Sequence, residues 1–281
     1  MRLSRREFVR LSGAAGFGAA LPFPIGRSRA GKLKRIGIQL YTVRQALDAD
    51  FAGTLQRLAA IGYQEVEFAW NRGTSPSETK ELLRATGLTA PAAHLSVEDF
   101  ESGWDATVAA TQTIGIENLV LAWIDADQRK TLGDYHQWAE RFNRYGTAAR
   151  KAGLTFAYHN HAAELTPIDG KIPYEILLSE TDPATVGFEM DVYWIVEGGG
   201  DPLGYFAKWP GRFPMLHVKG RAADRAMVDV GAGTVDWEAI FAHAKRAGVR
   251  HSFVEHDDAP DPFASAAASY SYLRKLRFHD A

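Results

Sequence analysis

Polar residues that could bind a metal or move a proton recur along the chain, each at the end of a short apolar run. They are Tyr41, Glu67, His94, His159 with His161, Asp191, His217 with Lys219, and Glu255 with His256. Taken singly, each has an ordinary explanation: a histidine at a strand end is more often structural than a ligand, Glu67 can be solvated, and Lys219 can pair with a carboxylate. Brought together, the imidazoles and carboxylates would form a mixed nitrogen and oxygen site suited to Mn²⁺, Mg²⁺, Co²⁺, Fe²⁺ or Zn²⁺.

The apolar runs that precede these residues are rich in β-branched and aromatic side chains, as strands are. We expect strands at 35–41, 63–69, 88–95, 117–122, 154–160, 185–192, 212–219 and 250–256. Amphipathic patterns between them predict helices, clearest at 51–61 and 134–152, and one more after Gly200. Glycines that would end a helix before the next strand are Gly62, Gly87, Gly153 and Gly248.

Eight strands alternating with helices, without a Pro/Ser-rich linker, predict one parallel eight-stranded (β/α)8 TIM barrel over 31–281. In this fold all strands point their carboxyl ends at one mouth, where the chemistry lies. Seven of the eight runs end on a titratable or hydrogen-bonding side chain. So many separate coincidences at one mouth would be unusual, and the sequence therefore predicts a polar site there.

Composition narrows the chemistry of that site. The chain of 281 residues has no cysteine, which excludes disulfides, a thiol nucleophile and zinc–thiolate ligands. A hydrophobic share of 46% with 23% charged residues is typical of a globular protein with a full core. Residues 1–30 hold six Arg and one Glu, which leaves 26 basic against 33 acidic residues in the rest. Residues 31–281 therefore have a net charge of about −7 and lack the basic face that binding of nucleic acid requires.

The first thirty residues have the pattern of an export signal. Ser4-Arg5-Arg6-Glu7-Phe8 precedes a weakly apolar, Gly/Ala-rich stretch and resembles a twin-arginine signal. The other interpretation is a membrane anchor, but the stretch holds Ser12, three glycines and two prolines and is too short and polar to span a bilayer of about 30 Å. We therefore expect a periplasmic protein without stable membrane insertion.

Five segments of the chain resemble the xylose isomerase-like barrel superfamily, often called sugar phosphate isomerase/epimerase, over most of 34–277. They are Tyr158-His-Asn-His161 with Glu164 downstream, Phe188-Glu-Met-Asp-Val-Tyr-Trp194, Leu216-His-Val-Lys219, Val230-Gly-Ala-Gly-Thr-Val-Asp-Trp237 and Phe253-Val-Glu-His-Asp257.

The resemblance implies a divalent metal ion held by residues from four successive strands. In relatives these are commonly a Glu, an Asp, a His and a second Glu, and the last three correspond to Asp191, His217 and Glu255. Where many relatives read Glu-Asn-His, this chain reads His159-Asn160-His161, so His159 takes the first ligand position by analogy. With His159 in place of a glutamate, the metal preference of the relatives, and a mechanism with two paired glutamates as bases, do not transfer directly to this chain.

A metal of this kind would stabilise negative charge on a sugar oxygen while a nearby base moves a proton. Glu255, His161 and Glu164 are the candidate catalytic bases, and an imidazole is better matched than a carboxylate that also touches the metal. Residues expected to contact the substrate are Glu67, His94, Trp194 and Lys219, with Trp123 as a second aromatic ring.

The Tyr-His-Asn-His variant resembles members that act on oxidised or unphosphorylated sugars, namely epimerases, dehydratases and eliminating lyases. The sequence thus predicts a metal-dependent isomerase, epimerase or carbon–oxygen lyase acting on a small carbohydrate, although Lys219, Arg221 and Arg225 could in principle bind a phosphate. Two alternatives are a sugar-binding barrel without turnover and a nuclease of the same superfamily with three zinc ions. The sequence also leaves a homodimer open.

Overall fold

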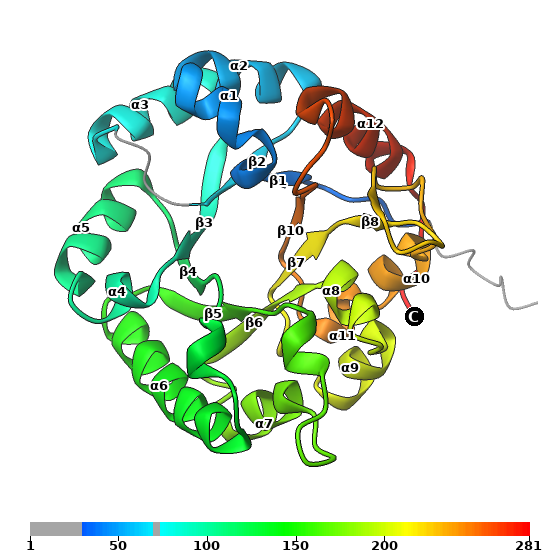
Figure 1. Cartoon of the computed structure of the whole chain (residues 1–281). Helices are drawn as coiled ribbons and strands as arrows, with labels where there is room; N and C mark the ends of the chain where they lie inside the picture. The colour runs from blue at the N-terminus through cyan, green and yellow to red at the C-terminus, as the bar shows by residue number, and fades with distance from the viewer. Residues whose placement is uncertain (1–29, 70–73) are drawn as a thin grey trace, which may run out of the picture.

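The computed structural model describes residues 30–69 and 74–281 and contains a closed barrel of eight parallel strands (Figure 1). The strands follow the order β1, β10, β7, β6, β5, β4, β3, β2 around the barrel. Their bounds are β1 Gly37–Gln39, β2 Glu65–Phe68, β3 Thr89–Leu95, β4 Asn118–Leu121, β5 Thr155–His159, β6 Val186–Asp191, β7 Met215–Val218 and β10 His251–Val254. The expected (β/α)8 barrel is confirmed, and each strand lies inside the run that predicted it.

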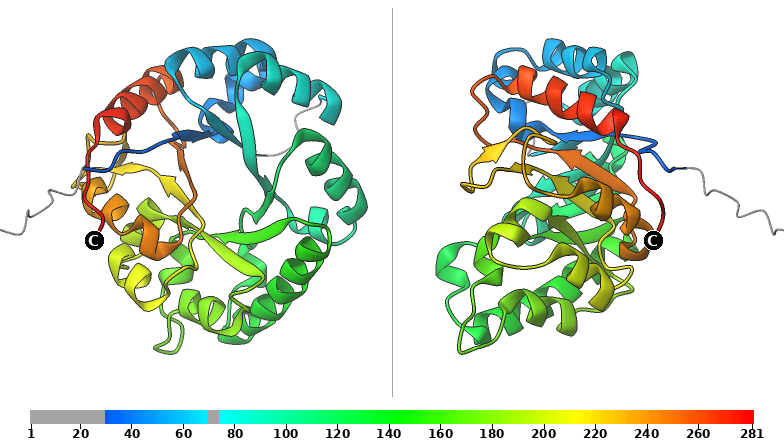
Figure 2. Two further views of the ribbon diagram at one scale, coloured as in Figure 1. Left: turned by 180° about the vertical axis from the view of Figure 1, so that it is seen from behind. Right: turned by 90° about the vertical axis from the view of Figure 1, so that its right-hand side faces the viewer.

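Helices fill the connections and form the outer ring (Figures 1 and 2). The α-helices are α1 Arg44–Ala49, α2 Phe51–Ile61, α3 Pro76–Thr86, α4 Val97–Phe100, α5 Trp104–Ile114, α6 Leu132–Lys151, α7 Pro173–Glu180, α8 Val192–Glu197, α9 Pro202–Lys208, α10 Trp237–Ala242, α11 Ala244–Ala247 and α12 Pro262–Lys275. Short 3-10 helices are η2 Leu40–Val43, η3 Ala126–Gln128 and η4 Ala162–Leu165.

Helix α6 shows how the pattern of apolar residues determines an element of the ring. Its buried stripe includes Trp138, Phe142 and Tyr145, which recur at helical spacing and pack on the barrel. Thr131 and Asp134 form a capping box at its start, where each side chain accepts a backbone hydrogen bond from the other residue. The expected helices at 51–61 and 134–152 are therefore confirmed, as is the one after Gly200.

Two of the predicted helix-ending glycines have a backbone that other residues rarely adopt. Gly87 after α3 has φ 73° and Gly248 after α11 has φ 90°. Both are in the left-handed region, which glycine enters without steric conflict at Cβ. The prediction also holds at Gly62 and Gly153, whose φ angles are positive.

The barrel interior changes from apolar to polar toward the mouth. Ala92, Val120, Ala157, Met215 and Phe253 form one buried cluster inside the barrel. Because residues two apart in a strand face the same side, the next inward residues along these strands form a second layer. They are His94, Ala122, His159, His217 and Glu255. Strand geometry alone therefore places four titratable side chains at the same level.

A small antiparallel hairpin, which the sequence did not predict, follows β7 directly. Its strands are β8 Gly220–Arg221 and β9 Met227–Val228. Each strand has two residues, which is too few to give an alternation of apolar and polar residues in the sequence. In the side view of Figure 2 the hairpin projects from one end of the barrel, while the C-terminus lies at the other.

The export signal expected for residues 1–30 lies, except for its last residue, outside the described part of the chain. Within 30–69 and 74–281, no helix is both long enough and apolar enough to cross a membrane.

Glu65, at the start of β2, makes ion pairs that stabilise the end of the barrel opposite the mouth. Its side chain is buried and contacts Arg35 at 3.2 Å and His251 at 2.9 Å. Burial acts to raise the pKa of Glu65, but the hydrogen bond and charge of His251, followed by those of Arg35, outweigh it and lower the pKa. The carboxylate therefore stabilises the fold above its unfolded pKa of about 4.3, and this contribution is lost as the pH falls through the lower folded value.

We expect Glu65→Gln to reduce the free energy of unfolding at pH 7 by about 1–2 kcal/mol, since Arg35 is exposed and screened. The difference between variant and wild type should shrink on acidification below about pH 4. Urea unfolding followed by circular dichroism between pH 3 and 7 measures both. A difference that stays constant over that range would contradict the assignment.

Candidate metal centre and active site

A cavity of about 360 Å³ opens at the mouth of the barrel. It is lined by Tyr41, Ala69, His94, Ala122, Trp123, His159, His161, Lys219, Glu255 and Asp257. Every one of these residues lies in the last two positions of a barrel strand or follows the strand closely, because the carboxyl ends of parallel strands meet at one end of the barrel. We call this space the inner cavity.

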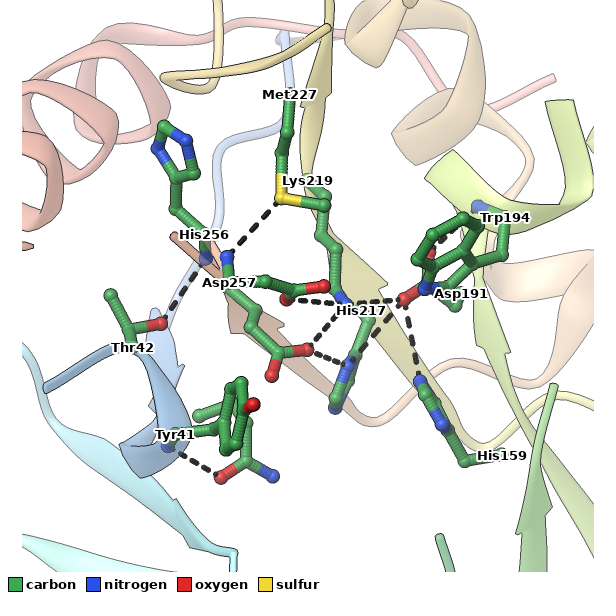
Figure 3. Close-up of polar contacts among 12 residues, drawn as sticks. Tyr41, Thr42, His159, Asp191, Trp194, His217, Lys219, Met227, His256 and Asp257 are labelled. Carbon is green, nitrogen blue, oxygen red and sulfur yellow. Dashed lines mark hydrogen bonds and ion pairs between the residues drawn. The ribbon is translucent and has the colours of Figure 1, made fainter. Parts of the chain in front are cut away.

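The four residues expected to bind a metal converge in this region, and Figure 3 labels three of them, His159, Asp191 and His217. One nitrogen or oxygen atom from each of His159, Asp191, His217 and Glu255 lies within 4.8 Å of the others. His159 Nε2 is 3.3 Å from Asp191 Oδ2, and His217 Nδ1 is 2.6 Å from Glu255 Oε2. All four residues are buried.

The orientation of His159 leaves one ring nitrogen facing this group. Its Nδ1 lies 3.1 Å from the carbonyl oxygen of Ala122, which can only accept a hydrogen bond. The proton therefore belongs on Nδ1, and the lone pair of Nε2 points toward Asp191. Burial lowers the pKa of His159, so the ring is held in the neutral form that binds metals.

Asp191 is fixed by the turn from β6 into α8. Its Oδ1 accepts a hydrogen bond from the backbone N–H of Trp194 at 3.0 Å as the N-cap of α8. Its backbone N–H donates to Asn160 Oδ1 at 3.1 Å. These contacts leave Oδ2 directed at the other candidate ligands.

His217 is held from below by two carboxylates. Its Nε2 lies 2.7 Å from Glu67 Oε2 and 3.2 Å from Glu189 Oε2. Burial acts to lower the pKa of His217, but the charges of Glu189 and Glu255 outweigh it and raise the pKa well above its ordinary value. A hydrogen bond from Nε2 to a carboxylate is the usual support of a metal-binding histidine and turns Nδ1 toward the site.

Glu67 and Glu189 are fully buried beneath the inner cavity and contact the same nitrogen of His217. Burial, followed by the charge of Glu189, raises the pKa of Glu67 to about 7. Burial also acts to raise the pKa of Glu189, but His217 and His94 hold it well below its ordinary value. His94 Nε2 is 2.7 Å from Glu189 Oε2, so this carboxylate contacts two imidazoles.

The arrangement fits a divalent cation. Two carboxylates and two imidazoles make an N₂O₂ set that Zn²⁺, Co²⁺ and Mn²⁺ accept. Among the described residues, His217 Nδ1 is a buried polar atom without a hydrogen bond of normal geometry, and it lies 2.6 Å from Glu255 Oε2, which also contacts Lys219 Nζ at 2.8 Å. An imidazole nitrogen and a carboxylate oxygen that face each other in this way are suited to share a cation.

Lys219 places a positive charge beside the same oxygen atoms (Figure 3). Its Nζ lies 3.0 Å from Asp191 Oδ2, 2.8 Å from Glu255 Oε2 and 2.9 Å from Asp257 Oδ1. Burial acts to lower the pKa of Lys219, but these three carboxylates raise it well above its ordinary value. The ammonium group is therefore charged and balances the carboxylates of the site.

His161 lines the inner cavity beside His159. Burial, followed by the charges of His159 and Lys219, holds the pKa of His161 well below its ordinary value. Its imidazole is thus neutral at neutral pH and can accept a proton. The centre of its ring lies 5.7 Å from that of Trp194, which packs against it.

Three residues expected in the site lie behind the wall of the inner cavity. Glu67 is fully buried and binds Gln39 and His217, so it supports a candidate ligand and does not face the substrate. Glu164 accepts hydrogen bonds from Tyr158 Oη at 2.9 Å and the His161 backbone at 2.8 Å, which occupy the carboxylate proposed as a base. Trp194 packs on His161 and lies 5.8 Å from Lys219 Nζ.

Two residues that sequence reasoning did not assign belong to the site. Glu189 supports His94 and His217, and Asp257 binds Lys219. Glu189 stands two positions before Asp191 in β6, so strand alternation could have shown that it faces the barrel interior, whereas Asp257 lies in the loop after β10 and has no such signal. The phosphate-binding alternative has less support, since Arg221 and Arg225 both bind Glu197.

Comparisons with known proteins extend these findings. A family model described as xylose isomerase-like TIM barrel matches residues 55–276. An inosose dehydratase from Lacticaseibacillus casei is 24% identical over 248 residues, covering 78% of this chain and 79% of the relative. The crystal structure of a sugar phosphate isomerase/epimerase from Parabacteroides distasonis aligns with a TM-score of 0.77 and 27% identity, over 90% and 98% of the two chains. The structure of the IOLI protein with a zinc atom has a TM-score of 0.67 and 14% identity, over 84% and 95%.

The position of Lys219 predicts opposite effects of two substitutions on metal binding. Lys219→Met removes a charge that repels a cation, so the affinity for Mn²⁺ should rise by about tenfold or more. Asp257→Asn removes the carboxylate that draws the ammonium away from Asp191 and Glu255, so the affinity should fall. Isothermal titration calorimetry measures both dissociation constants.

Lys208→Met is the matched control, because Lys208, at the end of α9, pairs with Glu175 of α7 and does not line the inner cavity. Its affinity for Mn²⁺ should equal that of the wild type. Weaker binding in Lys219→Met would contradict the prediction.

Proposed function

Because the chain belongs to the xylose isomerase-like TIM barrel family, we propose that it is a metal-dependent sugar isomerase, epimerase or dehydrating lyase. It would remove a proton next to the carbonyl group of a keto-sugar or sugar derivative. The proposal depends on one observation: His159, Asp191, His217 and Glu255 converge beside a cavity that also exposes His161 and Lys219.

The relatives support this class of reaction. The inosose dehydratase is a lyase, and the similar Parabacteroides structure is a sugar phosphate isomerase/epimerase. Both reaction types can begin with removal of a proton next to a carbonyl group. They differ in whether the proton returns to the substrate or a neighbouring oxygen leaves.

We propose that His159, Asp191, His217 and Glu255 hold one Mn²⁺, Mg²⁺, Co²⁺ or Zn²⁺ ion. The structure of the IOLI protein, which has the same fold, contains zinc. A bound ion supplies Lewis-acid stabilisation of the negative charge that develops on a substrate oxygen. Nitrogen ligands at two of the four positions favour Zn²⁺, Co²⁺ or Mn²⁺ over Mg²⁺, which prefers oxygen.

His161 is the best candidate for the base. It lines the inner cavity, its ring is neutral, and Glu164 fixes its backbone through the hydrogen bond at 2.8 Å. In the proposed step the proton leaves the carbon next to the carbonyl group for a ring nitrogen of His161. The electron pair of the C–H bond moves toward the carbonyl oxygen.

Glu255 is less suited to this role. Burial acts to raise its pKa, but Lys219 and His217 hold it well below its ordinary value. The pKa of His161 is also lowered, but His161 is not one of the four candidate ligands, so its lone pair stays free for a proton, whereas Glu255 would share its electrons with the cation. Lys219 and His94 also line the inner cavity and can donate hydrogen bonds to substrate oxygens.

Exchange of solvent deuterium into a keto-sugar tests the proposal. We expect metal-loaded protein to catalyse exchange into D-fructose or an inosose, followed by NMR. His161→Ala should reduce the exchange rate at least about a hundredfold, as expected on losing a general base, and leave metal content unchanged. His217→Ala should abolish both the exchange and the binding of metal.

His256→Ala is the control for loss of a buried imidazole, because His256 Nδ1 bonds Ser265 Oγ and the ring does not line the inner cavity. It should retain metal and exchange. A protein that only binds sugars would catalyse no exchange, so its absence in the metal-loaded wild type would reject the enzymatic proposal. Unchanged metal content in His217→Ala would reject the metal centre.

We also propose that the protein is periplasmic. The support is the Arg5-Arg6 pair and the weakly apolar stretch that follows it. Replacement of both arginines by lysine should leave the protein in the cytoplasmic fraction, because twin-arginine transport reads the pair. Immunoblots of periplasmic and cytoplasmic fractions measure the distribution, and unchanged export would contradict the proposal.

A further inference from the structure

Trp123 is an apolar side chain displayed at the mouth of the barrel. It follows β4 directly, and its side chain is 49% exposed. Among the described residues it is the one large hydrophobic side chain with this degree of exposure. All the other large apolar side chains of 30–69 and 74–281 are buried or partly buried. An indole ring at this position is therefore available for contact with a ligand.

The indole ring is held in one orientation. Its Nε1 donates a hydrogen bond to Asp125 Oδ1 at 3.0 Å. The following turn is fixed at two further points, where Arg129 Nε donates to the Ile124 carbonyl at 2.7 Å and Trp138 Nε1 donates to the Gln128 carbonyl at 2.8 Å. A fixed aromatic ring binds with a smaller loss of conformational entropy than a mobile one.

Trp123 also separates two cavities. On one side it lines the inner cavity with His161 and Lys219. On the other side it lines a second space of about 460 Å³, which we call the outer cavity. The wall of the outer cavity includes Ser96, Glu98 and Ser102, whose hydroxyl and carboxylate groups suit the hydroxyls of a sugar. The loops after β3 and β4 supply this wall, so both cavities lie at the mouth.

The floor of the inner cavity limits the direction in which a substrate can extend. His159 and Glu255 line it, and beneath them His217, Glu67 and Glu189 are fully buried. A ligand larger than one sugar ring must therefore project away from the metal centre. Trp123 offers an apolar face on that path, and the outer cavity offers polar groups beyond it.

From this arrangement we propose that the substrate is a glycoside of two sugar rings. The reacting ring occupies the inner cavity, and the second ring stacks on Trp123 in the outer cavity. The inference rests on the proposed function, because that proposal identifies the ligand of the inner cavity as a sugar. It adds a binding subsite that selects substrates by size.

Calorimetric titration of metal-loaded protein tests the subsite without requiring turnover. The probes are methyl β-D-glucoside with cellobiose, and methyl α-D-glucoside with maltose. We expect one disaccharide to bind about tenfold more tightly than its matched methyl glucoside. Trp123→Ala should remove this gain, so that the disaccharide and its matched methyl glucoside bind the variant with affinities that agree within about twofold.

Trp123→Phe keeps an aromatic ring and should retain most of the gain, which separates stacking from a general loss of folding. His161→Ala, in the inner cavity, should change the affinity for both members of a pair to a similar extent. Equal affinities within both pairs, a gain that survives in Trp123→Ala, or no binding of either disaccharide at millimolar concentration would each overturn the subsite.

The outcomes distinguish this proposal from the proposed function. If the Trp123-dependent gain is present but solvent exchange is absent, the subsite stands and the proton chemistry fails. If exchange is present but the gain is absent, the chemistry stands and the substrate is smaller than a disaccharide.

Discussion

The compensation of buried carboxylates by His217 and Lys219 is the interaction on which the mouth of the barrel depends. His217 contacts Glu67 and Glu189 through one nitrogen and faces Glu255 with the other. An uncompensated charge in such a place would cost several kcal/mol, because the interior replaces little of the hydration that the group loses. His217 lies in β7 and Lys219 follows β7 directly, so both groups that contact the buried carboxylates come from one strand and its end.

The strand period explains how a charged layer can lie above an apolar one. Phe253 belongs to the apolar cluster inside the barrel, and Glu255, two residues later, faces the candidate metal centre. Met215 and His217 have the same relation in β7. The step of two residues raises the side chain by one layer without changing its direction. The fold can therefore keep its packed core while it places ligands one layer higher.

The sequence predicted the residues that strand geometry alone positions. The candidate ligands lie at or within one residue of a strand end, and in a parallel barrel that is enough to bring them together; they are His159, Asp191, His217 and Glu255. Where a local turn sets the direction of a side chain, the sequence predicted the residue but not its direction. Glu164 lies in η4, where the chain folds back, and its carboxylate is directed at Tyr158 and away from the inner cavity.

Glu67 and Glu189 show a second property that the sequence did not predict, which is the layer of the barrel in which a side chain lies. A polar residue at a strand end was taken to face the substrate, but the register pairs Glu67 with Ala92 of the apolar layer, and its side chain contacts His217 from below. Glu189 was missed for the related reason that it precedes the end of β6 by two residues. Which layer a residue occupies depends on the stagger of neighbouring strands, and the residue pattern of one strand does not contain that information.

The hairpin after β7 contacts both the helix that follows Asp191 and the loop that follows Glu255, and so links two candidate ligands indirectly. Glu197, the last residue of α8, binds Arg221 and Arg225, and Tyr193 Oη donates to the Arg225 carbonyl at 2.9 Å. On its other side the hairpin presents Met227 Sδ to the backbone N–H of Asp257 at 3.2 Å. Asp257 in turn binds Lys219, so the hairpin ties the helix that follows Asp191 to the loop that follows Glu255. A change in the hairpin would therefore move the ammonium group relative to both carboxylates while leaving the four ligand side chains intact.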